Sequence, residues 1–475
     1  MVKITVTKQQ NDAINFQAEH VLIKGAPGSG KTTVLLMKIE KILHANPNAK
    51  ILLITYNKTL AAYAQKYLAD RGYSQCNLEV RTFHSWASKY LRQIKGKFSS
   101  SSYQVDKLFD NCYENQKTKD HRFYSDDKFK SFLKDEIEWI KGKGIVSEDE
   151  YLNIRRSGRM VSLQQSDRKE VYTFMKQFDK NLTMASIIPF DEYGIQLHQN
   201  LDIVKTKESY EYVMIDEAQD LTQVQLIVLR ELNPKSLIIS ADIGQRIYKT
   251  DFTWRSVGIN IVGGRTKHLE EMHRSCQEIV TMARPLYNKD LNSNSSKNSE
   301  EAREELIVPK KSSGFLPEIH QYGKHEEEYE GILKLVQELW NKTSDKDITI
   351  GVLCRHKMHL KKLKGMMPYS IPHEHIEKEN GSCLTPGVKF VTMHSAKGLE
   401  FDVVIIPRFT DKNLPSLKRA EAEEEVEDAI QVERRLLYVS MTRAKTRLFI
   451  TGYGNKMSRF MDEFERGTYN LIAYQ

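Results

Sequence analysis

Eight residues near the N-terminus form a pattern that binds phosphate groups. Residues 25–32 read GAPGSGKT, which satisfies G-x-x-x-x-G-K-[ST]. The glycines let backbone amides approach a phosphate, Lys31 would reach the β- and γ-phosphates of a nucleotide, and Thr32 would ligate Mg²⁺. An apolar run at 21–24 precedes the pattern and a helical pattern at 32–43 follows it, which is the context the motif requires. We therefore expect an ATP and Mg²⁺ site rather than an accidental glycine-rich turn.

An acidic pair follows a second apolar run. Asp216 and Glu217 come directly after YVMI at 212–215. A carboxylate at the C-terminal end of such a strand lies where open α/β sheets bind their ligands. Asp216 would hold Mg²⁺, and Glu217 would orient and deprotonate an attacking water. An Asp-Glu pair alone is usually structural, but together with the phosphate-binding pattern it predicts a hydrolytic site.

The elements that must position these residues alternate between short apolar runs and helical patterns. The runs lie at 21–24, 51–56, 212–216, 236–240, 349–354, 388–393 and 403–407. Continuous apolar runs indicate strands buried on both faces, as in parallel α/β sheets. We expect an α/β fold with two parallel-sheet domains. The first would comprise residues 1–94 and 200–264, with an α-helical insertion at 95–199, and the second residues 265–475.

Length and composition agree with this organisation. A chain of 475 residues is too long for one ordinary domain. Its 71 basic and 63 acidic residues leave a charge of +8, which suits a polyanionic partner such as nucleic acid without proving one. No apolar run approaches the roughly 18 residues of a membrane span, and the opening MVKITVTKQQ lacks signal-peptide features. We expect a cytoplasmic protein without a membrane partner.

Further stretches occur in a fixed order along the chain. They are ITYNKTLA at 54–61, RTFHSWA at 81–87, DEAQD at 216–220, ADIGQRIY at 241–248, TMHSAKGLEF at 392–401 and RRLLYVSMTRAK at 434–445. With the phosphate-binding pattern they resemble the superfamily 1 helicases of the UvrD/Rep type, along nearly the whole chain. The resemblance implies two RecA-like domains with an ATP cleft between them. It also implies ATP-driven 3′→5′ movement on single-stranded DNA and strand separation at single-strand/duplex junctions.

The resemblance assigns roles to individual residues. It implies catalytic roles for Lys31, Glu217, the γ-phosphate sensor Gln245 and two arginine fingers, Arg274 and Arg443. The nucleotide would be contacted by Gln10, Gly25, Ala26, Gly28, Ser29, Gly30, Lys31, Thr32, Thr33, His273, Gly398 and Glu400, and Mg²⁺ by Thr32 and Asp216. The nucleic acid would be contacted by Tyr56, Asn57, His84, Tyr248, Phe252, Trp254 and His394. An aromatic residue taken alone is more often part of a core, but position within the motifs favours base stacking for Tyr56 and Trp254.

Several features depart from the family pattern. His273 replaces the tyrosine that stacks on adenine in relatives, and residues 355–387 are too few for the helical 2B domain that relatives carry before HSAKGLEF. The basic stretch at 155–159 fits either a duplex-tracking patch or a plain solvated surface. Two alternatives stay open: an ATP-gated nucleic-acid sensor or recruiting subunit with little unwinding, and an RNA-directed motor. The pathway, the oligomeric state and a protein partner that activates or recruits the chain also stay open.

Overall fold

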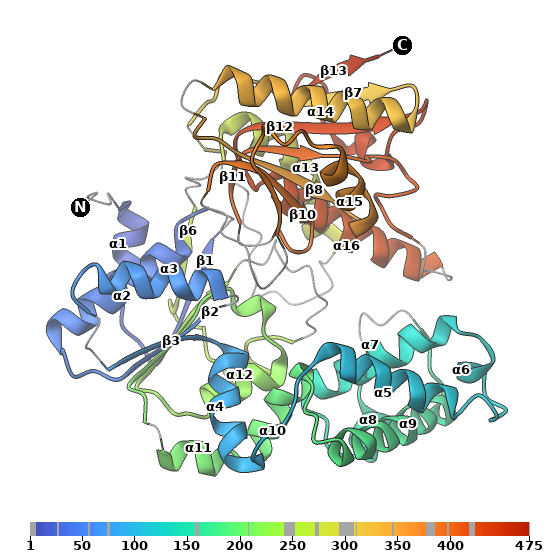
Figure 1. The fold of residues 1–475 in the computed structure, drawn as a ribbon. Coiled ribbons are helices and arrows are strands. Elements are labelled where there is room, and N and C mark those ends of the chain that lie inside the picture. Colours follow the sequence, from blue (N-terminus) through green and yellow to red (C-terminus); the bar gives the residue numbers. More distant parts are fainter. Residues whose placement is uncertain are drawn as a thin grey trace.

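Two parallel β-sheets, one in each half of the chain, organise the fold in the computed structural model (Figure 1). The structure describes residues 6–474 apart from the segments 26–27, 56–57, 74–76, 157–160, 208, 242–251, 271–274, 294–307, 310, 344–345, 377–384, 397–398 and 418–422. All strand pairings in both sheets are parallel. This confirms the expected α/β fold class.

The first sheet has six strands in the order β3-β2-β4-β5-β1-β6. Its strands are β1 (His20–Gly25), β2 (Ile51–Thr55), β3 (Leu78–Thr82), β4 (Tyr212–Ile215), β5 (Ser236–Ala241) and β6 (Thr266–Leu269). Side chains alternate between the two faces, so that Leu52 and Ile54 of β2 enter one apolar core and Ile51 and Leu53 enter the other. Burial on both faces explains why β2 is apolar from Ile51 to Ile54.

Helices cover both faces of the first sheet. On one face lie α1 (Lys8–Asn15), α2 (Lys31–Ala45) and α3 (Lys58–Ala69). On the other lie α4 (Phe83–Lys95), α10 (Tyr193–Gln199), α11 (Leu201–Lys207) and α12 (Gln223–Arg230). A short 3-10 helix, η2 (Ala218–Asp220), follows β4.

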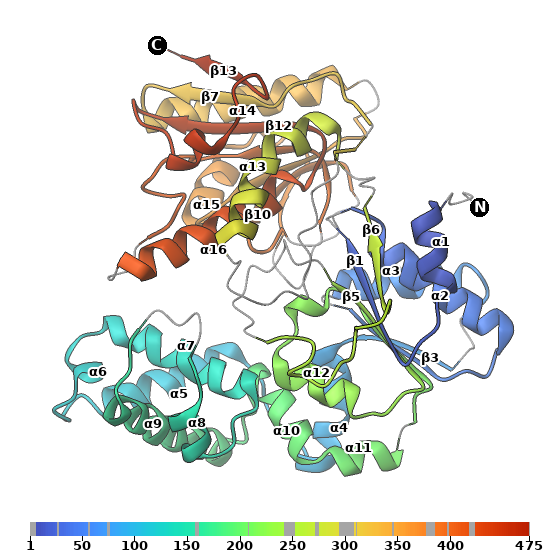
Figure 2. The same cartoon turned by 180° about the vertical axis from the view of Figure 1, so that it is seen from behind.

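A helical insertion leaves the first domain after α4 and forms a body of its own beside α10 and α12 (Figures 1 and 2). It consists of α5 (Ser102–Glu114), α6 (Arg122–Ser125), α7 (Lys128–Lys143), α8 (Glu148–Asn153) and α9 (Gln165–Met184), and η1 (Phe190–Glu192) leads back. Its separate apolar core includes Phe109, Ile140 and Phe174. An isolated bridge between Ser99 and Ile187 joins the outgoing and returning chain.

The second sheet has seven strands in the order β13-β7-β12-β11-β8-β10-β9. The strands are β7 (Glu318–Tyr322), β8 (Thr349–Cys354), β9 (His373–His375), β10 (Gly387–Thr392), β11 (Phe401–Ile406), β12 (Ala444–Tyr453) and β13 (Asn470–Ala473). One face is covered by α13 (Gln277–Ser293) and α16 (Glu423–Met441), the other by α14 (His325–Lys342) and α15 (Lys357–Met366). A 3-10 helix, η4 (Arg459–Glu463), precedes β13.

The structure corrects two domain boundaries. β6 pairs with β1, so the first domain reaches at least Leu269 rather than ending at residue 264. Tyr193 and Leu197 of α10 pack in the core of the first sheet, so α10 belongs to that domain and the insertion is shorter than 95–199. Both boundaries were misplaced for the same reason. β6 and α10 are short and partly polar, so their sequences do not indicate which apolar core they join. Among the helices in the described ranges, none combines the length and apolar character that a membrane span requires.

Candidate nucleotide and nucleic-acid sites

The phosphate-binding loop has a backbone that only glycine adopts easily. β1 ends at Gly25 and α2 begins at Lys31, and Gly28 and Gly30 have φ of 77° and 85°. Side chains other than glycine rarely occupy this left-handed region. A Cβ on Gly30 would also lie 2.5 Å from Gln10 Nε2, and one on Gly25 would lie 2.3 Å from Ser29 Oγ. The loop therefore has no room for a side chain at position 25 or position 30.

Polar groups inside the loop fit a bound phosphate. The Lys31 side chain is buried, and its ammonium donates to the Gly25 carbonyl at 2.7 Å. The Ser29 hydroxyl is also buried, and the described residues offer it no hydrogen-bond partner. A buried hydroxyl of this kind is costly unless a ligand oxygen completes it. Together with the start of α2, these donors suit an anion.

Two distant segments meet where Mg²⁺ would bind. Thr32 Oγ1 donates to Asp216 Oδ2 at 2.6 Å, and the Ser240 hydroxyl donates to the other carboxylate oxygen. Asp216 is 2% exposed, and its burial and the Glu217 carboxylate raise its pKa, although Ser240, Thr32 and Lys31 oppose that rise. A hydroxyl and a carboxylate are oxygen ligands of the kind Mg²⁺ prefers. The residues present therefore fit the metal that the sequence predicts.

Glu217 is held in an uncommon backbone conformation. It has φ of 53° and ψ of 45°, which few residues other than glycine adopt. The Gln219 amide donates to Glu217 Oε2, and the Glu217 backbone amide donates to Asp216 Oδ1 at 3.1 Å. Such strain persists when the surroundings impose it and is common at functional sites. The two neighbouring carboxylates therefore have different hydrogen-bond partners, Thr32 and Ser240 for Asp216 and Gln219 for Glu217.

Gln10 is engaged with its own helix and with the loop. Its Oε1 accepts from the Thr7 amide at 3.0 Å in a capping box at the start of α1. Its Nε2 donates to the Ser29 carbonyl at 2.9 Å, and the side chain is 6% exposed. Both ends of the amide therefore have partners, and the clearest role of Gln10 in this structure is to join α1 to the phosphate-binding loop.

The described site residues of the second domain are buried or half-buried within that domain. Arg443 is 1% exposed between α16 and β12, and its Nε donates to the Val439 carbonyl at 3.0 Å. Its own carbonyl accepts from the Phe401 amide at 3.0 Å. His394 and Glu400 are half-buried in the segment between β10 and β11. Arg443 is therefore a buried side chain held against the end of α16 in this structure.

The structure contradicts the expected stacking surface around Trp254. Trp254 is 2% exposed and Phe252 is 7% exposed, and both pack in the core of the first sheet. Their ring centroids are 5.7 Å apart at an interplanar angle of 80°. Both rings lie in this apolar core and expose almost no surface to a base. Core packing therefore describes these two residues.

A different aromatic group is accessible beside the insertion. The His84 ring of α4 lies 5.3 Å from the Phe190 ring and 5.7 Å from the Tyr193 ring, both near edge-on. His84 is half-buried, while Phe190 is 45% exposed. The motif RTFHSWA predicts a role for His84, whereas Phe190 lies in none of the expected motifs. Its only signal was an aromatic residue after a proline, in the stretch PFDEY that follows the helical pattern of the insertion.

Models of known protein families match the two halves of the chain separately. The family model of the UvrD/REP helicase N-terminal domain matches residues 6–269, which is more than half of the chain. The chain belongs to the UvrD/REP helicase family. A second model, the UvrD-like helicase C-terminal domain, matches residues 370–455. This family member is an ATP-dependent DNA helicase by enzyme class.

Individual relatives of this family member are distant. A probable DNA helicase of Mycoplasma pneumoniae is 23% identical over 94% of this chain and 83% of its own length. A probable DNA helicase II homolog of Rickettsia felis is 25% identical over 61% of this chain and 45% of its own. The ATP-dependent DNA helicase PcrA of Staphylococcus aureus is 42% identical over 15% of this chain and 10% of its own. The matches to the last two cover less than half of those proteins.

Other expected site residues have no described structure. Ala26, Tyr56, Asn57, Gln245, Tyr248, His273, Arg274 and Gly398 lie outside the described residues. Thr33 is described and lies half-buried in the first turn of α2. In the basic stretch at 155–159, Arg156 is 6% exposed and pairs at 2.6 Å with the fully buried Glu136. Arg156 is therefore an interior residue of the insertion and does not present its charge to a duplex.

Proposed function

We propose that this protein couples ATP hydrolysis to 3′→5′ movement along single-stranded DNA and to separation of a duplex ahead of it. The observation that carries the proposal is the contact of Thr32 with Asp216 at the C-terminal ends of β1 and β4, with Glu217 next to it. This arrangement brings a phosphate loop, two oxygen ligands for Mg²⁺ and a general base into one site. Membership of the UvrD/REP helicase family supports a DNA substrate and a link between hydrolysis and movement.

The residues divide the work of hydrolysis between them. Lys31 and the backbone amides of residues 25–31 would bind and orient the β- and γ-phosphates. Thr32 and Asp216 would hold Mg²⁺, which when bound neutralises phosphate charge. Glu217 would accept a proton from the attacking water, at its carboxylate. Arg274 and Arg443 are the proposed arginine fingers, each acting only after the second domain closes on the first.

The accessible rings beside the insertion are the proposed contact with the DNA strand. Phe190 presents nearly half of its surface and stands against His84. Bases stack on exposed aromatic faces without regard to sequence, which suits a protein that moves along any strand. The net charge of +8 is consistent with a polyanionic partner. Single-stranded DNA and its junctions with duplex are therefore the proposed substrates.

Strand displacement tests the direction and the substrate together. We would compare a DNA duplex with a 3′ tail, one with a 5′ tail and a 3′-tailed RNA duplex, with Glu217→Gln as the inactive control. Displacement of the 3′-tailed DNA alone is expected. Preference for the 5′ tail would reverse the proposed polarity, and preference for RNA would favour the RNA-directed motor. Strand-stimulated ATPase activity without displacement would favour the nucleic-acid sensor.

A further inference from the structure

A buried lysine lies where the helical insertion returns to the first domain. Lys141 stands near the end of α7, and its side chain is 5% exposed. Its ammonium pairs with Asp179 of α9 at 2.9 Å and also with Glu192 of η1. The Glu192 side chain is itself 10% exposed. One cation therefore ties two helices of the insertion to the segment that leads into α10.

The surrounding carboxylates keep this lysine charged. Burial by itself lowers the pKa of a lysine, but Glu192, Asp191 and Asp179 outweigh burial here and raise the pKa of Lys141 above its ordinary value. A buried charge is costly unless its partners stay within reach. The charge on Lys141 therefore restrains the position of Glu192.

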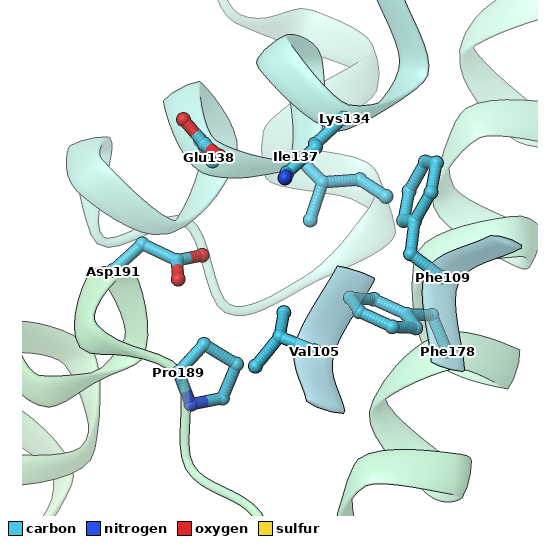
Figure 3. A pocket seen from close by; sticks show the side chains of 8 residues that line it. All are labelled: Val105, Phe109, Lys134, Ile137, Glu138, Phe178, Pro189 and Asp191. Carbon is cyan, nitrogen blue, oxygen red and sulfur yellow. The ribbon is translucent and has the colours of Figure 1, made fainter. Parts of the chain in front are cut away.

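A small pocket borders this segment on the side of the insertion. Figure 3 shows a pocket that Pro189 and Asp191 line from one side and side chains of α5, α7 and α9 from the other. The other lining residues are Val105, Phe109, Lys134, Ile137, Glu138 and Phe178. Pro189 and Tyr193, on either side of Phe190 and Glu192, are buried. The ion pair at Glu192 adds a polar restraint to this apolar packing of residues 189–192.

The restrained segment carries the accessible ring of the proposed strand site. Phe190 and Glu192 share the single turn of η1, and the Phe190 ring lies against His84 and Tyr193. A displacement of Glu192 would move Phe190 with it, since only one residue separates them. Stacking on a base needs a ring held in place before the strand arrives, because ordering it afterwards costs entropy.

The end of α7 also rests on the domain that would bind ATP. A Cβ on Gly142 would lie 3.3 Å from Thr222 Cγ2, and Lys143 Nζ donates to Gln223 Oε1 at 3.3 Å. Thr222 caps α12, which begins shortly after Glu217. The turn that holds Lys141 is therefore braced against a helix of the first domain, so Lys141 fixes η1 relative to that domain.

We propose that Lys141 is a positioning residue for single-strand binding, which holds Phe190 against His84 through its ion pair with Glu192. The inference rests on the proposed function, because it takes Phe190 and His84 as contacts of the strand. Lys141 itself touches no substrate. Its loss should weaken strand binding while leaving the chemistry of ATP hydrolysis intact.

The test separates positioning from simple destabilisation. We would measure the affinity of the full chain for a fluorescent oligothymidylate by anisotropy, the ATPase kcat at saturating strand, and the melting temperature. Lys141→Met should weaken the strand affinity about 10-fold, the equivalent of losing one stacked base, and leave kcat within about twofold. Lys141→Arg keeps the charge and should restore most of the affinity.

A matched control is available in a second buried ion pair of α7. Arg156→Met breaks the buried pair with Glu136 of α7, away from η1, so it should lower the melting temperature without changing strand affinity. Wild-type affinity in Lys141→Met, or an equal loss in Arg156→Met, would overturn the inference. If Lys141→Met does not fold, Glu192→Gln makes the same comparison with a smaller change. Absence of strand-stimulated ATPase in the wild-type protein would instead reject the proposed function.

Discussion

The hydroxyl of Thr32 lies 2.6 Å from the carboxylate of Asp216, although 184 residues separate the two in the chain. β1 and β4 are not neighbours in the sheet, since β5 lies between them. All three strands are parallel, so their C-terminal ends meet at one edge of the sheet. Ser240, at the end of β5, donates to the same carboxylate and completes the arrangement. The whole helical insertion is accommodated between β3 and β4 without disturbing this edge.

Glu217→Gln should separate nucleotide binding from turnover. The amide keeps the size of the side chain but cannot accept the proton from water, so the ATPase rate should fall about 10²–10⁴-fold. Nucleotide affinity should remain close to that of the wild type, because Lys31 and the loop are unchanged. Lys31→Ala should lose both nucleotide affinity and ATPase activity. A fluorescent ATP analogue and a steady-state ATPase assay measure the two quantities. Near-normal turnover of Glu217→Gln would remove the general-base role from this residue.

Gln10→Ala tests whether this amide reads adenine or supports the loop. The substitution leaves the buried Ser29 carbonyl and the Thr7 amide without the partners seen here, at a cost of about 1–3 kcal/mol. If Gln10 chiefly supports the loop, the KM for ATP and that for GTP should rise by similar factors. A loss confined to ATP would instead indicate adenine recognition. Gln9→Ala is the matched control, because Gln9 lies in the same helix but contacts Glu270 at 2.7 Å.

Trp254→Ala should lower stability but not strand affinity, and Phe190→Ala should lower strand affinity but not stability. Trp254 is in the core, so its removal should cost about 3–5 kcal/mol of stability and lower the melting temperature. The folded protein should still bind a single strand normally. Phe190 is accessible, so Phe190→Ala should lose about 1–3 kcal/mol of strand affinity with little change in melting temperature. Thermal unfolding and fluorescence anisotropy on both variants decide the assignment. Weaker strand binding by stable Trp254→Ala protein would restore the stacking role to Trp254.

Glu138 should make the insertion less stable as the pH rises towards neutrality. Desolvation, with the nearby carboxylates of Asp191 and Asp135, raises the pKa of Glu138 to about 7, while Lys134 and Lys141 act in the opposite direction. The folded state therefore holds a proton that the unfolded chain releases above its ordinary pKa, and the free energy of unfolding falls as pH rises between these values. Glu138→Gln cannot titrate and should flatten the dependence of the melting temperature on pH between about 5 and 8. An unchanged dependence would show that other groups produce it.

Most interior strands could be predicted from the sequence, and the edge strands could not. The expected apolar runs correspond to β1, β2, β4, β5, β8, β10 and β11, which all lie inside their sheets. The strands at the sheet edges, β3, β6, β9 and β13, were all missed, as were β7 and β12. An edge strand has a neighbour on one side only, and its residues are partly exposed, so it needs no continuous apolar run.

The residues expected at the nucleotide site could be picked out from the sequence, because each belongs to a short local pattern. Gly28 and Gly30 are required by the backbone conformation of the loop, and Asp216 and Glu217 by their place at the end of a strand. Residue type and spacing encode these features directly, because each depends on its immediate neighbours.

Only the tertiary structure decided which side chains are exposed to solvent and which are buried or paired with other side chains of the chain. Trp254 lies near a recognisable motif, yet its ring is buried, and Phe190 lies in no expected motif, yet its ring is accessible. Lys141 looked like any lysine of a solvated helix until Asp179 and Glu192 were brought beside it from elsewhere in the chain. Burial and ion pairing depend on contacts between segments distant in sequence, and a single sequence does not record which of those contacts form.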